Sequence, residues 1–303
     1  MPLKILDIFR DLNKFQFQLL SLIEVNMAYH EIVPVETIVT IMKYSEKKIQ
    51  VELRRLKRLK LIFMIQRHYL GVALTFMGYD ALSLRAMVEK GVIDQVGPEI
   101  GAGKESNIHL VINDKGKQFL IKIHRLGKLD FRATRKARSF LAEKRHLSPL
   151  YESRLSAERE YEALTTLYNA GISVPQPIAQ NRHIVAMEII NGIDLYRVKK
   201  NEYESQEQIL SLFENILEEI RKATAVGFIH GDLSEYNIRL DENEYPVLFD
   251  WPQYIETSAI QAKEVLKKDI ENILKFFFRK FNLEYKIKVL DIVNELLISP
   301  IGN

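Results

Sequence analysis

The hydrophobic pattern of the chain changes near residue 92, and this change constrains the fold more than any other feature. Before it, apolar residues recur at helical spacing in several short segments, as at Phe17, Leu20 and Ile23. After it, short apolar runs alternate with turns, and long helical segments come later. A chain of 303 residues is long enough for two domains. We therefore predict one domain over 1–92 and a second, two-lobed α+β domain over 93–303.

Composition indicates an ordinary folded protein and excludes several kinds of site. Apolar residues make up 47% of the chain and charged residues 27%, which is the usual balance in globular proteins. Cysteine is absent, so disulfides, thiolate metal sites, iron–sulfur clusters and cysteine nucleophiles are excluded. No apolar run approaches the about 18 residues of a membrane span, and no signal-peptide pattern opens the sequence. We expect a cytoplasmic, monomeric protein with no membrane partner.

The N-terminal segment predicts a winged helix-turn-helix. The expected helices cover residues 35–42, 45–60 and about 75–90, and the expected strands cover 61–66 and 69–74. Ser45 is a suitable N-cap for the middle helix. Two helices joined by a tight turn and followed by a β-ribbon are typical of domains that present their second helix to a nucleic-acid groove.

That second helix has one apolar face and one basic face. Lys47, Arg54 and Arg58 fall on the side opposite the apolar positions at 100° per residue. Residues 45–60 hold seven lysines and arginines against two glutamates, and a second basic segment, 122–148, holds nine. We therefore predict that Lys47, Arg54 and Arg58 contact a nucleic acid. The alternatives are a solvated helix surface or packing against the second domain.

A glycine turn, GAGKESN over residues 101–107, begins the chemistry of the second domain. The strands expected around it cover 93–96, 109–112 and 119–124. Backbone N–H groups of such a turn approach a phosphate closely because no Cβ intervenes. A Walker loop is excluded, because Pro98 replaces its first glycine and Glu105 replaces its Ser or Thr. A Rossmann turn is excluded because a strand follows. A plain hairpin turn remains the alternative.

One lysine interrupts the apolar strand that follows. Lys122 lies in FLIKIH, and protein kinases place a lysine on such a strand beside the ATP phosphates, held by a glutamate on a later helix. Further elements are expected as a helix over 156–170, a strand over 184–190 and a helix over 206–226. In the first of these helices Glu160 is our choice of partner, and Glu158 remains open. An ordinary edge-strand lysine is the alternative.

The segment HGDLSEYN after the last of these helices is the most specific signal. It places Asp232 and Asn237 five residues apart, and thirteen residues later an apolar strand ends in LFDW with Asp250. Phosphoryl transfer needs a carboxylate that orients or deprotonates the attacking oxygen, with an amide oxygen and a second carboxylate to hold Mg²⁺. Packing does not explain this spacing. A metal hydrolase is disfavoured because the seven histidines show no His-x-x-x-His pair.

Together these segments resemble the RIO family of atypical protein kinases. The resemblance rests on GAGKES over 101–106, IKIHRLG over 121–127, SRLSAEREY over 153–161, HGDLSEYN over 230–237 and LFDWPQ over 248–253. The winged helix and LTFMGYD over 74–80 resemble the branch of the family that carries such a domain. The likeness extends to about Phe281.

The resemblance implies roles for individual residues. Those of the nucleotide site are Gly101, Gly103, Lys104 and Ser106 in the phosphate loop, Lys122 with Glu160 as the lysine–glutamate pair, and Met187, Glu188 and Ile190 in the hinge that contacts adenine through its backbone. Asp232 matches the catalytic aspartate, and Asn237 and Asp250 match the metal ligands. The implied divisions are an N-lobe over about 93–187, a hinge over 187–192 and a C-lobe over about 193–303.

The resemblance also implies a function, cofactors and partners. Members of this branch act in maturation of the small ribosomal subunit and bind its pre-ribosomal particle and rRNA. The implied cofactors are ATP and Mg²⁺, for which Mn²⁺ substitutes. Autophosphorylation or ATP hydrolysis, through an aspartyl phosphate at Asp250, would act as a release switch. The segment from Leu126 to about Tyr151 matches a basic loop of the family.

One departure from ordinary protein kinases affects the choice of acceptor. Trp251 and Pro252 replace the usual Phe-Gly, no Ala-Pro-Glu motif is present, and about fifteen residues precede the helix expected near Lys263. This leaves little room for a peptide-binding platform, so self-modification or water is the favoured acceptor. The alternatives are a small-molecule phosphotransferase of the aminoglycoside or choline kinase type and a DNA-binding regulator with a nucleotide-sensing kinase-like domain. The basic winged helix and GAGKES argue against the former.

Overall fold

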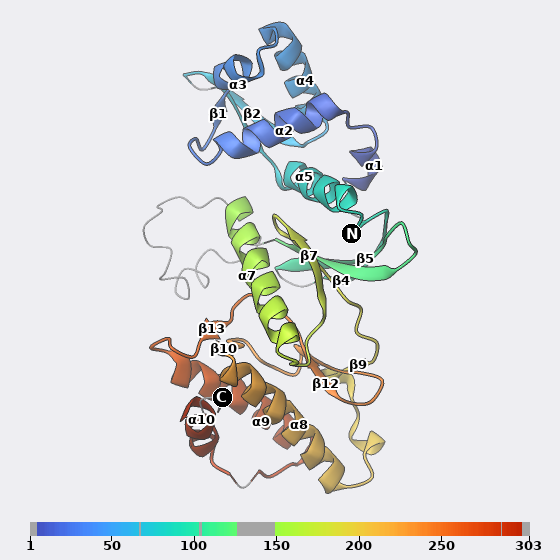
Figure 1. Cartoon of the computed structure of the whole chain (residues 1–303), viewed down its shortest axis with the longest axis vertical. Coiled ribbons are helices and arrows are strands. Elements are labelled where there is room, and N and C mark those ends of the chain that lie inside the picture. The colour runs from blue at the N-terminus through green and yellow to red at the C-terminus, as the bar shows by residue number, and fades with distance from the viewer. Residues whose placement is uncertain (1–4, 67, 103–104, 126–148, 286, 299–303) are drawn as a thin grey trace. The chain divides into compact units, whose positions relative to one another are not determined.

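A computed structural model describes residues 5–66, 68–102, 105–125, 149–285 and 287–298 (Figure 1). Contacts group the chain into two compact units. The first comprises Met1–Arg154 with Asn181–Ile184, and the second comprises Leu155–Gln180 with Val185–Asn303. Because the first unit joins the N-terminal helices to the first strands of the second predicted domain, the boundary predicted near residue 92 stays a prediction.

The N-terminal part of the first unit is a winged helix-turn-helix, as predicted. Its elements are α1 (Leu6–Phe9), α2 (Lys14–Asn26), β1 (Val33–Pro34), α3 (Val35–Met42), α4 (Glu46–Arg58), β2 (Ile62–Gln66), β3 (Leu70–Leu74) and α5 (Phe76–Glu89). The three strands form an antiparallel sheet in the order β1-β3-β2. Ile49, Leu53 and Leu56 of α4 are fully buried, which confirms its apolar face. Ser45 stands at the N-cap position of α4, but its side chain makes no capping hydrogen bond.

Three antiparallel strands complete the first unit: β4 (Gln95–Ala102), β5 (Ser106–Ile112) and β6 (Gln118–His124). Both β4 and β5 are longer than expected, because Gly101 pairs with Ile108 and Ala102 pairs with Asn107. Two irregularities of register in β4 interrupt the period-two pattern by which a strand is recognised in a sequence. The residues on either side of the predicted glycine turn therefore belong to a β-hairpin, and the turn's Gly103 and Lys104 lie outside the described residues.

Helices dominate the second unit. Its main elements are α7 (Pro149–Asn169, of which residues from Leu155 on belong here), β7 (Pro177–Asn181), β8 (Ile184–Met187), α8 (Gln206–Ala225), α9 (Ala262–Phe281) and α10 (Val289–Ile298). The last three helices pack together (Figure 1). Phe213, Phe277 and Phe281 are fully buried, and the Phe213 and Phe277 rings lie 5.3 Å apart. Among the described residues, no helix is both long and apolar enough to cross a bilayer.

Short strands of the second unit flank the segments that contain Asp232, Asn237 and Asp250. They are β9 (Ile193–Asp194), β10 (Phe228–Ile229), β11 (Ile238–Leu240), β12 (Pro246–Leu248) and β13 (Ile255–Glu256). The strands β12, β11 and β9 form one antiparallel sheet, and β10 pairs with β13. The segment 230–237 follows β10, and Asp250 comes two residues after β12. The strand pairs thus bring these two segments into one part of the unit.

Candidate active site

The loop that carries Asp232 turns sharply at a glycine. Gly231 has a φ of +84°, in the left-handed region, and a Cβ on it would lie 2.5 Å from the carbonyl oxygen of Gln253. A side chain here would meet both backbone strain and a backbone clash. Glycine therefore lets the loop approach the segment that follows Asp250.

A buried carboxylate on α9 holds this loop in place. Asp269 accepts hydrogen bonds from the main-chain N–H groups of Gly231 (2.8 Å) and Leu233 (3.0 Å), the two neighbours of Asp232. Asn272, also on α9, donates to the Leu233 carbonyl at 3.1 Å. Burial raises the pKa of Asp269 to about 6, although both amide bonds act in the opposite direction. The sequence analysis missed Asp269, whose signal was an aspartate among the apolar positions of an amphipathic helix.

Asp232 and Asp250 are close enough to influence one another. Burial raises the pKa of Asp232, the negative charge of Asp250 raises it further, and Lys268 lowers it. A carboxylate with a raised pKa and an acidic neighbour is a common arrangement at catalytic sites. Asp232 is thus placed to orient an attacking oxygen or to take its proton.

Asn237 is fixed by its backbone and by its side-chain amide. Its Nδ2 donates to the carbonyl oxygen of Asp232 at 2.9 Å, and its own carbonyl accepts from the Phe249 N–H at 3.1 Å. The bond through Nδ2 does not use the amide oxygen Oδ1. The same residue therefore connects the loop with the strand end that leads to Asp250.

Asp250 adopts a backbone conformation that is uncommon for a residue with a side chain. Its φ is +73°, which costs of order 1–3 kcal/mol and is found most often at functional sites. The neighbouring Trp251 holds this turn in place. It is 1% exposed, its indole N–H donates to the Leu248 carbonyl at 3.3 Å, and its ring lies 4.5 Å from that of His230. The tryptophan thus replaces the usual phenylalanine with a bulkier and hydrogen-bonded anchor.

The chain beyond Asp250 returns at once to the body of the unit. Within five residues it forms β13, where Ile255 pairs with Ile229 directly before the catalytic loop. Arg159 of α7 donates to the carbonyl oxygen of Pro252 at 3.2 Å and also binds that of Tyr254. Helix α9 then begins at Ala262. The stretch between Asp250 and α9 therefore contains no extended activation segment.

The structure places the remaining nucleotide-site residues on separate elements. Lys122 lies on β6, opposite Ile108, and is 6% exposed, whereas Glu160 lies on α7 and is 1% exposed. Glu158 is partly exposed, so burial favours Glu160 as the glutamate that needs a cation. The two side chains belong to different units, and their pairing stays a prediction.

The residues predicted as the hinge follow β8. That strand ends at Met187, earlier than the expected strand end at Ile190. Beyond the strand, the Glu188 N–H donates to the Gln176 carbonyl at 2.9 Å, and the Ile190 carbonyl accepts a hydrogen bond from Arg239 at 3.0 Å. Neither bond uses the Glu188 carbonyl or the Ile190 N–H.

The donors at the site suit magnesium held jointly with a nucleotide. Asn237 and Asp250 offer an amide oxygen and a carboxylate, which are hard oxygen ligands. No group of three or more His, Asp or Glu side chains with metal-site geometry occurs in the described part of the chain. Mg²⁺ usually takes one or two carboxylates together with substrate phosphates rather than a complete protein cage. The two residues fit this mode of binding.

The basic face of α4 is exposed as predicted. Lys47, Arg54 and Arg58 are all exposed, and Arg54 donates to Gln50 one turn earlier at 3.1 Å. Lys48, in contrast, lies over the Tyr44 ring at 4.0 Å. The exposed cations are available to a polyanion, and their contact with nucleic acid stays a prediction. Most of the second basic segment, residues 126–148, lies outside the described residues.

We expect Asp269→Asn to lower kcat about tenfold, because a small displacement of a catalytic group costs up to about a hundredfold. Asparagine has one carbonyl oxygen where Asp269 uses two, so either Gly231 or Leu233 loses its acceptor. Steady-state kinetics of ATP turnover check this. A matched control is Glu271→Gln, on the same helix but without a bond to the loop. Equal kcat values for Asp269→Asn and the wild type would contradict the assigned role.

The loop, the aspartate after β12 and the lysine strand define a phosphotransferase of the protein-kinase type, joined to a winged helix. Comparisons with known proteins agree with this class. The RIO domain model matches residues 107–290, and the Rio2 N-terminal model matches residues 9–90. By these matches the chain belongs to the RIO family of serine/threonine-protein kinases, in its Rio2 branch.

Individual relatives resemble the chain over most of its length. A RIO-type serine/threonine-protein kinase Rio2 of Methanocaldococcus jannaschii is 40% identical over 266 residues, which cover 88% of this chain and 97% of that protein. A serine/threonine-protein kinase rio2 of Dictyostelium discoideum is 37% identical over 90% of this chain and 51% of that protein. The crystal structure of a Rio2 kinase–ADP/Mg²⁺–phosphoaspartate complex from Chaetomium thermophilum matches with a TM-score of 0.81 and 29% identity, over 97% of this chain and 89% of that one.

These comparisons confirm three predictions from the sequence: the family, the winged helix followed by a kinase-like domain, and the enzyme class. They favour a protein kinase over both a small-molecule phosphotransferase and a nucleotide-sensing regulator. The roles of the individual site residues stay predictions, supported by the geometry described above.

Proposed function

We propose that this kinase uses ATP with Mg²⁺, for which Mn²⁺ substitutes, and transfers the γ-phosphoryl group to its own Asp250 or to water. The observation that carries the proposal is the short stretch between Asp250 and α9. It pairs through β13 with the strand before the catalytic loop and offers no platform for a peptide. The phosphoaspartate in the related crystal structure supports the same reaction.

In this reaction Asp232 and Asp250 have different tasks. A carboxylate oxygen of Asp250 forms a bond to the γ-phosphorus, and ADP leaves with the electron pair of the broken bond. Asp232, with its raised pKa, then orients a water molecule and accepts its proton as the aspartyl phosphate is hydrolysed. Bound Mg²⁺, held by Asn237 and Asp250, would neutralise phosphate charge.

The nucleotide itself would be held by groups of both lobes. Lys122 and the loop with Gly101 and Ser106 would bind the phosphates, as protein kinases do with a strand lysine and a glycine-rich loop. Adenine would bind to the Glu188 carbonyl and the Ile190 N–H, which the two hinge hydrogen bonds leave unused.

We further propose that the protein acts on the precursor of the small ribosomal subunit in the cytoplasm, and that it is a monomer. Support comes from its place in the Rio2 branch and from the exposed basic face of α4. Hydrolysis of the aspartyl phosphate would release the protein from the particle. Incubation with γ-labelled ATP and Mg²⁺, with and without small-subunit particles, tests the proposal. The amount of released phosphate and the amount of label bound to the protein should both change when particles are added. Transfer of the label to added peptides instead would contradict the proposal.

Charge reversal of the basic face should weaken binding to RNA particles strongly at low salt. Each phosphate contact releases a condensed counterion, so Lys47→Glu, Arg54→Glu and Arg58→Glu together should flatten the log–log salt slope by roughly 0.7 to 0.9 per contact removed. Titrations at several salt concentrations measure this slope. ATP turnover without RNA should hardly change. An unchanged slope would mean that the basic face of α4 is only a solvated surface, and RNA contact would then be expected in the segment 126–151.

A further inference from the structure

The LTFMGYD segment at the start of α5 contains residues that local structure explains and residues that it does not. Thr75 caps the helix, since its Oγ1 accepts from the Gly78 N–H at 3.1 Å. Gly78 lies against the Leu61 carbonyl, where a Cβ would come within 2.2 Å of the oxygen. Neither requirement involves Asp80, a nearly buried carboxylate one turn into the helix.

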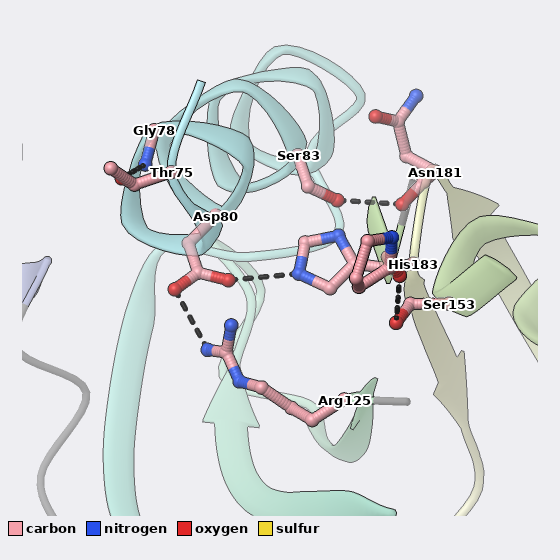
Figure 2. Close-up of polar contacts among 9 residues, drawn as sticks. Thr75, Gly78, Asp80, Ser83, Arg125, Ser153, Asn181 and His183 are labelled. Atoms are coloured by element: carbon pink, nitrogen blue, oxygen red, sulfur yellow. Dashed lines mark hydrogen bonds and ion pairs between the residues drawn. The ribbon is translucent and has the colours of Figure 1, made fainter. Parts of the chain in front are cut away.

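Asp80 binds two side chains of the kinase domain, the guanidinium of Arg125 and the imidazole of His183 (Figure 2). Its Oδ2 accepts from the Arg125 guanidinium at 2.7 Å, and its Oδ1 lies 2.8 Å from Nε2 of His183. The side chains of Asp80 and Arg125 are only 5% and 12% exposed. Burial by itself raises the pKa of Asp80, but the hydrogen bond with His183 and the charge of Arg125 together keep it below its ordinary value.

Arg125 joins this cluster to the glycine hairpin. It directly follows β6, and its main-chain N–H donates to the carbonyl oxygen of Glu105 at 2.6 Å. Glu105 precedes Ser106, whose strand position is opposite His124. The His124 N–H in turn donates to the His183 carbonyl at 2.9 Å. Asp80 therefore binds Arg125 and His183, whose backbones are hydrogen-bonded to Glu105 on one side of the end of β6 and to His124 on the other.

We propose that Asp80 is a positioning residue for the phosphates of ATP: through Arg125 it fixes the Glu105 end of the glycine hairpin. The proposal rests on the phosphate-binding role proposed above for this hairpin. Asp80 acts on the hairpin through Arg125, whereas its bond with His183 supports the strand that follows on the other side of β6. The first helix after the wing is thereby part of the nucleotide-binding machinery of the kinase.

Nucleotides with and without phosphates distinguish this role from simple attachment of α5. Asp80→Asn keeps the shape of the side chain but removes the charge that pairs with Arg125. It should weaken the binding of ATP and ADP about tenfold, within the range usual for coupled sites, and leave the binding of adenosine unchanged. Titration calorimetry with the full chain measures all three, and thermal unfolding verifies that the variant is folded.

Glu24→Gln is a matched control. Glu24 of α2 binds Arg182 at 2.6 Å and 2.7 Å, so it also attaches the winged helix to residues 181–183. Among the described residues, Glu24 forms its hydrogen bonds and ion pair with Arg182 and none with Arg125 or Glu105. Its variant should bind ATP like the wild type. Equal losses of ATP binding in Glu24→Gln and Asp80→Asn would overturn the proposal, as would a loss for adenosine as large as that for ATP.

Arg125→Gln tests the same link from its other end, and it serves alone if Asp80→Asn does not fold. The single variant should lose as much ATP affinity as Asp80→Asn, and the double variant should lose no more than either, as expected for residues that act in series. Additive losses would contradict the link. A wild-type chain that binds ATP no tighter than adenosine would instead contradict the proposed role of the hairpin itself.

Discussion

Asp250→Ala is expected to abolish Mg²⁺-dependent ATP turnover, and Asn237→Ala to reduce it severely. Each substitution removes an oxygen that would hold the metal against the phosphates, and losing several kcal/mol of charge stabilisation lowers kcat at least about a thousandfold. Asp250 also provides the carboxylate that the proposed reaction modifies. Steady-state release of phosphate from ATP measures the effect. Nucleotide binding without metal should persist in both variants.

Two further variants make this result specific. Asp250→Asn keeps the shape of the side chain, and asparagine tolerates the positive φ of this position, so the variant separates the carboxylate from backbone strain. Glu242→Gln removes an exposed acidic charge from the β11–β12 turn and should leave turnover unchanged. Turnover at the wild-type rate in Asp250→Asn, with Mg²⁺ still required, would refute the assignment of Asp250.

Lys122→Ala should lower kcat by about a hundredfold to a thousandfold and change the Kd for ATP only modestly. The ammonium would orient the phosphates, whereas adenine would be held by the backbone of residues 188–190. Separate measurements of Kd and of single-turnover rates distinguish these effects. Because Lys122 is buried, Lys122→Met provides a variant with nearly conserved volume.

Lys117→Ala is the control for this prediction. Lys117 is exposed, lies next to the start of β6 and stacks over the Phe119 ring at 5.2 Å. Its loss should affect neither quantity. If Lys122→Ala raised Kd while leaving the single-turnover rate intact, Lys122 would be a binding group only.

Features that depend on local sequence were predictable here. The amphipathic pattern of α4, with Leu53 and Leu56 inward and Arg54 and Arg58 outward, predicted both its buried and its exposed face. The spacing of Asp232 and Asn237 was equally informative, because a short loop after a strand fixes both within a few residues. Within one short continuous segment, the local backbone structure determines the relative positions of the side chains, independently of distant parts of the chain.

Features that depend on distant parts of the chain were not predictable. Asp269 became visible as the support of the catalytic loop only when α9 was placed beside Gly231 and Leu233, more than thirty residues earlier. Asp80 belongs to the LTFMGYD segment, but its partners Arg125 and His183 are 45 and 103 residues away in the sequence. A buried charge needs a partner, but the sequence alone does not identify a partner that lies far away along the chain.

The chemical nature of the phosphorylated residue tests the central claim most directly. After incubation with γ-labelled ATP and Mg²⁺, the label on the wild-type chain should be released by hydroxylamine, as acyl phosphates are, and should map to the peptide that contains Asp250. The Asp250→Asn variant should carry none of it. Label that resists hydroxylamine and maps to serine or threonine, at equal levels in Asp250→Asn, would contradict the account.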